Sequence, residues 1–396
     1  MRTRLAYLAA LLAAAACKEG RRAPTEPPAA PSFGTLIVDF IIGGGDAGAE
    51  LRYPTVLVAG PQVYFVYVEP AGQVARFAGC PGSCDRQGNW RVGTIRTESS
   101  GANFSAAVLT RSGLQVVYNS YSAGGLRYLT CPGLCDDSTH WQMLDVDTAG
   151  ATGLYAALAA NQAGGLRALY VRVDNNKGWL QYAECEAGCL SAANWRLATI
   201  DSRGGAGDPA VGIDGGGRIH VVYRAPNPSG SSYGIRYATC AAACTDPTNW
   251  GIIPLDETPG FTYDAPLSLG IGADNHLHLI YWTLGDLRYA TCPANCSSLA
   301  SWEIAVVATN AGYPRGSALA IGPSGRVHLA YSDGEVRYAS CDSGCAHLSG
   351  SQWITVAPRG FGGSGYDFVA LAIDSLDQPH LALSTGGGIK YAWRNQ

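Results

Sequence analysis

One pattern constrains the fold of this chain more than any other: a Cys-x-x-x-Cys pair followed by a tryptophan, which occurs six times. Successive first cysteines lie 49 to 55 residues apart. The tryptophan follows the second cysteine by six residues in five repeats and by eight in the last one, at Trp353. A fixed period of this length indicates an array of one supersecondary unit. The pairs are Cys80/Cys84, Cys131/Cys135, Cys185/Cys189, Cys240/Cys244, Cys292/Cys296 and Cys341/Cys345.

Each repeat contains four short segments with the properties of β-strands. In the sixth repeat, a small apolar run at 316–321 is followed by an alternating segment at 326–331, and the dipeptide Asp333-Gly334 then marks a hairpin turn. Two further segments, 336–340 and 353–357, flank the cysteine loop. Four short antiparallel strands in about fifty residues are typical of one blade of a β-propeller.

The number of blades follows from the third strand, whose short motif occurs seven times, for example at 336–339 and 389–392. The last repeat ends at Gln396 without a cysteine loop or a fourth strand, whereas one unpartnered strand, 34–41, precedes the first repeat. We therefore predict an all-β, seven-bladed β-propeller over residues 34–396, with four antiparallel strands per blade. The N-terminal strand supplies the missing outer strand of the last blade, which leaves no open edge there.

The N-terminus has the features of a targeting segment. Arg2 and Arg4 precede an apolar run from Leu5 to Ala16, which is too short for a permanent membrane span and predicts a signal peptide at 1–16. Cys17 follows three alanines, a pattern that resembles the bacterial lipobox. We expect lipidation of Cys17, with a charged, proline-rich tether at 17–33 and a lipid anchor in the bacterial cell envelope, at the outer membrane. An ordinary secreted protein is the alternative.

The twelve remaining cysteines are all paired at i, i+4, and close even pairs in an exported chain predict disulfides. Turn formers such as Pro81 and Gly82 within the loops allow the two Cα atoms to approach to about 6 Å. The alternative, a zinc site built from two pairs, would require cysteines from different blades. We therefore predict six disulfides and neither a metal nor a cofactor.

The last repeat also carries a resemblance to a known family. Its sequence Leu-Ala-Ile-Asp, His-Leu-Ala-Leu and Ile-Lys-Tyr-Ala, within 371–392, is similar to blades of secreted bacterial propellers of the sialidase-like, BNR-repeat type. The resemblance implies the propeller architecture and, for the enzymatic members of the family, glycan cleavage. The Asp-box that marks sialidase blades, Ser-x-Asp-x-Gly-x-x-Trp, is missing from this chain.

Several residue types recur at one position of the repeat, and we interpret them first as structural. The histidines His220, His278, His328 and His380 fall in second strands, where packing or a hydrogen bond is expected rather than a metal ring. Third-strand tyrosines such as Tyr338 are expected to pack between blades. The arginines beside them, such as Arg337, are expected to cover aromatic rings or form local ion pairs.

Function in a propeller is expected from the loops that vary between blades. If the small apolar run is the innermost strand, the loops that lead into it lie on the face opposite the cysteine loops. These loops contain aromatic, acidic and arginine side chains, with Asn103 and Phe104 in the second repeat. This mixture suits a polar ligand. The candidate ligand-binding residues are Arg52, Tyr53, Tyr155, Asp208, Tyr263, Asp264, Tyr313, Arg315, Tyr366 and Asp367.

Three functions remain open from the sequence. The first is a cell-envelope binding or assembly module for a glycan or a protein ligand. The second is a sialidase-like glycoside hydrolase, which needs two carboxylates about 5–9 Å apart, for which Asp208, Asp264 and Asp367 are available. The third is a structural surface protein without a small-molecule ligand. The net charge of −4 argues against binding to nucleic acid, which is recognised by positively charged surfaces.

Overall fold

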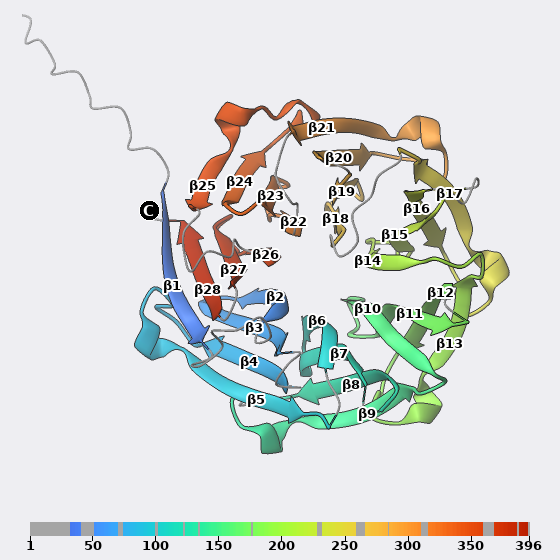
Figure 1. The fold of residues 1–396 in the computed structure, drawn as a ribbon, viewed down its shortest axis with the longest axis horizontal. Helices are drawn as coiled ribbons and strands as arrows, with labels where there is room; N and C mark the ends of the chain where they lie inside the picture. The colour runs from blue at the N-terminus through green and yellow to red at the C-terminus, as the bar shows by residue number, and fades with distance from the viewer. Residues whose placement is uncertain are drawn as a thin grey trace, which may run out of the picture. The chain divides into compact units, whose positions relative to one another are not determined.

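The computed structural model describes residues 32–40, 51–69, 74–99, 102–121, 123–133, 135–175, 177–227, 232–258, 266–283, 285–309, 316–358, 368–385 and 388–394. The predicted signal peptide and Cys17 lie outside these residues. Within the unit that begins at Ser32, the strands form seven four-stranded antiparallel sheets arranged around a central axis (Figure 1). The predicted seven-bladed propeller is therefore confirmed. In this part of the chain, no helix is long and apolar enough to cross a membrane.

The strands occupy equivalent places in every blade. The inner strands are β2 (Arg52–Ala59), β6 (Ala102–Thr110), β10 (Ala151–Ala160), β14 (Gly207–Ile213), β18 (Ser268–Ile271), β22 (Gly316–Ile321) and β26 (Phe368–Ile373). The second strands are β3 (Gln62–Glu69), β7 (Gly113–Ser120), β11 (Leu166–Asp174), β15 (Ile219–Pro226), β19 (Leu277–Trp282), β23 (Val327–Ser332) and β27 (Pro379–Thr385).

The two remaining strands complete each sheet on its outer side. The third strands are β4 (Val74–Cys80), β8 (Gly125–Cys131), β12 (Lys177–Cys185), β16 (Tyr233–Cys240), β20 (Asp286–Cys292), β24 (Val336–Cys341) and β28 (Gly388–Arg394). The outer strands are β5 (Arg91–Thr97), β9 (Gln142–Asp147), β13 (Arg196–Asp201), β17 (Gly251–Asp256), β21 (Glu303–Thr309), β25 (Ile354–Ala357) and, for the seventh blade, β1 (Phe33–Phe40).

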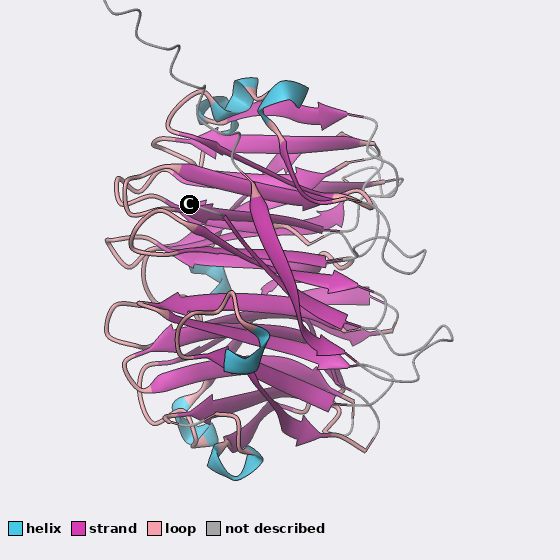
Figure 2. Ribbon diagram, turned by 90° about the vertical axis from the view of Figure 1, so that its left-hand side faces the viewer, coloured by secondary structure: helices cyan, strands magenta, loops and turns pink. Residues whose placement is uncertain are grey.

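The hairpins give each blade two distinct ends. Each of the six cysteine-bearing third strands ends at the first cysteine of its loop, opposite the start of the second strand, as in the pair Leu166 and Cys185. The cysteine loops therefore share one side with the turns that join the first two strands. We call this side the lower face, and we call the side at which the second strands end the upper face. The short 3-10 helical turns of the cysteine loops lie on one side in Figure 2.

The N-terminal strand closes the ring, as predicted. β1 pairs antiparallel with β28, so that Leu36 lies opposite Tyr391 and Asp39 opposite Ile389. The side chain of Phe33 also reaches the sixth blade, where its ring centroid lies 5.3 Å from that of Tyr338. The edge of β28 is consequently covered by the start of the chain, which removes an exposed template for strand pairing.

All six predicted disulfides are present, with paired Cα atoms 5.6–5.8 Å apart. Each bond closes the short loop between the third strand of a blade and its outer strand. The cysteines therefore have the structural role that the sequence predicts, and the pairing is confirmed in every repeat. The bonds join Cys80 to Cys84, Cys131 to Cys135, Cys185 to Cys189, Cys240 to Cys244, Cys292 to Cys296 and Cys341 to Cys345.

The cysteine loops also hold the recurrent tryptophans in place. In the first five repeats, the indole Nε1 donates a hydrogen bond to the backbone carbonyl of the second cysteine, as from Trp250 to Cys244 at 2.8 Å. The same ring packs against the third-strand aromatic residue of the preceding blade, and the centroids of Trp250 and Tyr182 lie 5.4 Å apart. Each loop thus fixes a tryptophan that stabilises the contact between two blades. The carbonyl acceptors in the other four repeats belong to Cys84, Cys135, Cys189 and Cys296.

Neighbouring blades are also joined by a buried polar cluster, which we call the interblade triad. It consists of a carboxylate near the end of one outer strand, a second-strand tyrosine of the next blade and, in four of five cases, a third-strand arginine of that blade. In the closing blade pair, Asp39 accepts hydrogen bonds from Tyr67 at 2.7 Å and Arg76 at 2.9 Å. The other clusters contain Glu98/Tyr118/Arg127, Asp147/Tyr170, Asp201/Tyr223/Arg236 and Asp256/Tyr281/Arg288.

Candidate functional site

The seven inner strands surround a cavity of about 390 Å³ on the axis of the propeller. Its wall is made from the small apolar runs that the sequence placed at the start of each repeat, so their innermost position is confirmed. Equivalent positions of the seven blades contribute one aliphatic side chain each. These residues are Val56, Ala107, Leu158, Val211, Leu269, Leu319 and Leu371.

Towards the upper face, the first four inner strands share an unusual backbone feature. Tyr53, Phe104, Tyr155 and Asp208 have positive φ angles of 51°, 51°, 54° and 43°. In each strand, the register of pairing with the second strand shifts at this point, which identifies a β-bulge. Non-glycine residues in this conformation cost roughly 1–3 kcal/mol each, and such strain is concentrated at functional sites. Its repetition at four equivalent positions makes this rim the candidate site.

The bulges bring three aromatic rings to the mouth of the cavity, where they meet a fourth ring from the start of β26. The centroids of Phe368 and Tyr53 are 4.7 Å apart, those of Tyr53 and Phe104 are also 4.7 Å apart, and those of Phe104 and Tyr155 are 4.4 Å apart. The rings come from four consecutive blades, and all four line the cavity. We call them the aromatic arc. Tyr53 and Tyr155 are half-buried, so parts of their rings remain available to a ligand.

Asp208 occupies the same bulge position in the fourth blade and extends the rim beyond the aromatic arc. Its carboxylate forms an ion pair with Arg224 of β15, and both side chains are buried. Among the described residues that line the cavity, Asp208 is the only one with a charged side chain. The described site therefore combines apolar rings with one neutralised charge pair, an arrangement that suits an uncharged or weakly polar ligand surface.

The structure brings together only part of the predicted set. Tyr53, Tyr155 and Asp208 lie on one rim, whereas Arg52, although next to Tyr53 in sequence, does not line the cavity. The remaining six predictions lie outside the described residues: Tyr263, Asp264, Tyr313, Arg315, Tyr366 and Asp367.

Phe368 was not among the predicted residues, although the repeat pattern contains a signal for it. The segment Phe-Val-Ala-Leu of the last repeat, from Phe368 to Leu371, aligns with Tyr-Ala-Ala-Leu at Tyr155 to Leu158. This alignment places Phe368 at the position of Tyr155.

The recurrent histidines are structural, as expected. In all four, the imidazole Nδ1 shares a hydrogen bond with the third-strand tyrosine hydroxyl of its own blade, for example from His328 to Tyr338 at 2.6 Å. Burial lowers the pKa of His278 and that of His328 to about 4, so both rings are neutral at pH 7. The described residues contain no group of histidine, cysteine and carboxylate side chains arranged to hold a metal ion.

Comparison with known proteins places this fold beside carbohydrate-active propellers. An ulvan lyase of polysaccharide lyase family PL25, bound to -[GlcA(1-4)Rha3S]-, is similar with a TM-score of 0.56 and 11% identity, covering 87% of this chain and 94% of that one. The polysaccharide lyase Uly1 gives a TM-score of 0.52 and 10% identity, covering 86% of this chain and 89% of that one. At these identities, the similarity shows the fold alone.

A third similar structure is the α-L-arabinofuranosidase Arb93A from Fusarium graminearum, in complex with an iminosugar inhibitor. Its TM-score is 0.50 at 10% identity, and the match covers 74% of this chain and 93% of that one. The sequence itself matches no known protein family profile and no curated protein.

Proposed function

We propose that this protein is a glycan-binding module that holds its ligand at the upper mouth of the central cavity. The observation that carries the proposal is the aromatic arc formed by Phe368, Tyr53, Phe104 and Tyr155. Sugar rings have apolar C–H faces that pack on aromatic rings, while their hydroxyl groups remain at the polar edge of the contact. The carbohydrate-active proteins that share the fold support the same ligand class.

Binding is a better match to the described rim than hydrolysis. A glycosidase uses two carboxyl groups about 5–9 Å apart on either side of the bond that it cleaves. Among the described residues that line the cavity, Asp208 is the only carboxylate, and it is already paired with buried Arg224. A carboxylate held by an arginine is a poor general acid, because the positive charge stabilises its ionised form.

Truncation of the two half-exposed rings tests the proposal. In isothermal titration against a panel of neutral and uronate-containing oligosaccharides, we expect Tyr53→Ala and Tyr155→Ala each to weaken binding by about tenfold, the typical loss for a central aromatic contact. Tyr64→Ala is the matched control, because Tyr64 lies near the start of β3, towards the lower face. A wild-type protein that binds no member of the panel, or variants that bind as tightly as the control, would overturn the assignment.

We further propose that the module is held at the bacterial outer membrane by a lipid on Cys17. The support comes from the sequence: an apolar run at 5–16, three alanines before Cys17 and a proline-rich segment after it. A protein that carries two membrane anchors, such as two lipid chains, stays stably on a bilayer, whereas a protein with an unmodified tether does not. The proposal places the propeller at the end of a tether, where its upper face is able to reach an envelope or external glycan.

Replacement of the acceptor cysteine tests the anchor. In membrane fractionation of a bacterial host, we expect Cys17→Ala to move most of the protein from the membrane pellet to the soluble fraction. Ser32→Ala, at the far end of the predicted tether, is the control and should remain in the pellet. Equal distribution of the two variants would contradict lipidation at Cys17.

A further inference from the structure

The contact between the fifth and sixth blades lacks one component of the interblade triad. The triad carboxylates Asp147, Asp201 and Asp256 occupy equivalent positions of their outer strands. Each lies opposite the equivalent aliphatic residue of the third strand of its blade. In the fifth blade this position, opposite Leu287, is occupied by Ala308. The sixth blade nevertheless retains the triad tyrosine, Tyr331, and the triad arginine, Arg337, which pair with each other across β23 and β24.

The contact between the sixth and seventh blades also lacks the carboxylate, but there the tyrosine and the arginine are replaced as well. Between the sixth and seventh blades, the carboxylate position is Ala357, opposite Val336. There the tyrosine position is Leu383 and the arginine position is Lys390, so all three components differ from the triad. At the contact between the fifth and sixth blades, only the acid has been lost, and its two hydrogen-bond donors remain.

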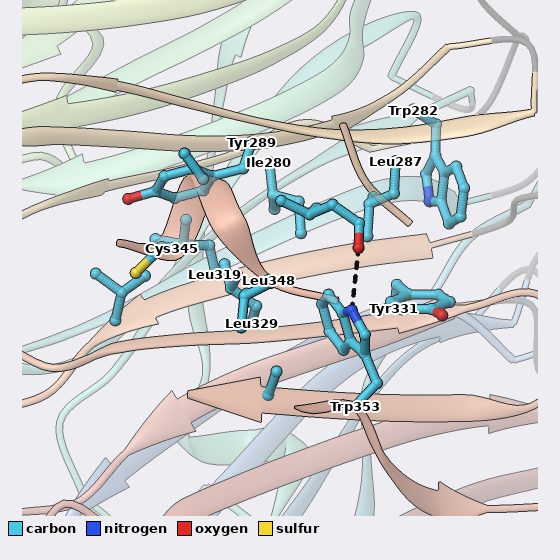
Figure 3. Close-up of a cluster of buried hydrophobic side chains, with 14 residues drawn as sticks. Ile280, Trp282, Leu287, Tyr289, Leu319, Leu329, Tyr331, Cys345, Leu348 and Trp353 are labelled. Atoms are coloured by element: carbon cyan, nitrogen blue, oxygen red, sulfur yellow. Dashed lines mark hydrogen bonds between the residues drawn. The ribbon is translucent and has the colours of Figure 1, made fainter. Parts of the chain in front are cut away.

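The cysteine loop of the sixth blade changes the packing at the same place. It is two residues longer than the others, and Trp353 donates its indole hydrogen bond to Val307 of the fifth blade at 3.1 Å instead of to its own cysteine loop. The ring lies against Tyr331, with centroids 4.7 Å apart, while Leu348 and Cys345 join the surrounding core (Figure 3). The tryptophan thus lies beside the incomplete triad.

This rearrangement leaves a cavity of about 390 Å³ between the two blades. Ala308 and Thr309 of β21 form one side, Tyr331 and Arg337 form the other, and Trp353 with Ser349 closes an end. The volume is within the range of small-molecule sites. A missing side chain alone would leave a smaller gap, so the cavity has room for a ligand that carries more than a carboxylate.

The polar atoms around the cavity also favour an anionic group. Arg337 binds Glu335 through one terminal nitrogen at 3.1 Å, but its buried Nε, the atom that Arg76 uses to bind Asp39, has no hydrogen-bond partner among the described residues. The Tyr331 hydroxyl forms no hydrogen bond with a described residue either, although, unlike Arg337 Nε, it is not a buried unpartnered atom. Two acidic residues are close by, because Asp333 lines the cavity and Glu335 binds Arg337, but a further carboxylate is compatible with them since Arg76 likewise binds both Glu69 and Asp39.

We propose that the cavity between the fifth and sixth blades binds a small carboxylate-bearing molecule. Its carboxylate takes the place of the missing acidic side chain and accepts hydrogen bonds from Arg337 Nε and the Tyr331 hydroxyl, and its body lies against the Trp353 ring. Charge-assisted hydrogen bonds of this kind are about twice as strong as neutral ones, which makes the carboxylate the determinant of recognition. This site is separate from the aromatic arc.

The test uses the purified propeller with D-glucuronate and acetate as probes and D-glucose as the uncharged counterpart of glucuronate. In titrations followed by the NMR signals of Trp353, which lines this cavity and not the central one, we expect saturable shifts with both carboxylates and none with glucose. Arg337→Met and Tyr331→Phe should each weaken glucuronate binding, the first by more than about tenfold. Tyr64→Ala, near the start of β3 in the first blade, lies in neither cavity and should leave it unchanged.

A substitution that restores the missing carboxylate gives the decisive test. Ala308→Asp supplies a carboxylate to Tyr331 and Arg337 from within the chain, so it should abolish glucuronate binding and raise the thermal unfolding temperature. Ala308→Asn adds a side chain of the same size without the charge and should block the site without that gain in stability. Failure of the wild type to bind either carboxylate, or wild-type affinity in Ala308→Asp or Arg337→Met, would overturn the proposal.

Discussion

Deleting residues 1–40 is expected to destabilise the propeller by several kcal/mol and to cause aggregation, whereas deleting residues 1–31 leaves its stability unchanged. The longer deletion removes β1, the outer strand of the seventh blade, together with the buried side chain of Val38 and the packing of Phe33 against the sixth blade. It also leaves β28 as an exposed edge, which favours pairing with other copies of the chain.

The effect of the longer deletion extends across the closure of the ring. Asp39 is the carboxylate of the first interblade triad, so its loss leaves the buried hydroxyl of Tyr67 without its acceptor and removes one partner of Arg76. A buried donor that loses its partner costs about 1–3 kcal/mol. Urea denaturation and light scattering of the two truncated proteins measure the difference. The same unfolding midpoint for both deletions would show that β1 does not stabilise the ring.

Glu98→Ala is expected to be the most damaging single substitution in the interblade clusters, with a loss of about 3–5 kcal/mol in the free energy of unfolding. Glu98 accepts hydrogen bonds from Tyr118, Ser120 and Arg127, and its own side chain is 2% exposed. Burial and the hydrogen bond to Glu98 both raise the pKa of Tyr118, so the tyrosine remains a donor. Removing the acid leaves two buried hydroxyls without their acceptor and leaves Arg127 with Asp145 as its remaining carboxylate partner.

Glu186→Ala is the matched control for this substitution. Glu186 also pairs with an arginine, Arg167, but its side chain is 52% exposed. Exposed ion pairs contribute about 0–1 kcal/mol, because water and salt screen the interaction. Equilibrium unfolding in urea compares the two variants with the wild type. If they lose similar amounts of stability, the buried carboxylate does not have the stabilising role that its contacts indicate.

The architecture could be predicted in detail because each part of it has a local cause. Turn residues such as Asp333 and Gly334 end one strand and begin the next, and the close cysteine pairs fix a loop at a constant place in the repeat. The lone strand at 34–41 indicated closure of the ring, because the last repeat has only three strands and needs a fourth to cover its edge. The structure places this strand at β1, Phe33–Phe40, as expected.

The candidate site could be predicted only in part. Tyr53, Tyr155 and Asp208 were recognised as residues of one face, but nothing local to them shows that their backbones adopt positive φ angles. Arg52 was included because of its charge, but it does not line the cavity. The interblade triads were also missed, because Asp39 and Tyr67 are 28 residues apart and meet only across two blades.

The sequence by itself determined the number of blades, the disulfides and the closure of the ring. These features depend on the repeat period and on the short-range turns that occur in the repeats. The longer loop before Trp353 is also visible in the sequence, but its effect on the packing of the tryptophan is not. Only the tertiary structure decided which side chains meet: the aromatic arc on the axis, and the cavity where Ala308 faces Tyr331 and Arg337. Contacts between blades join residues distant in the chain, so their chemistry emerges only when the ring is assembled.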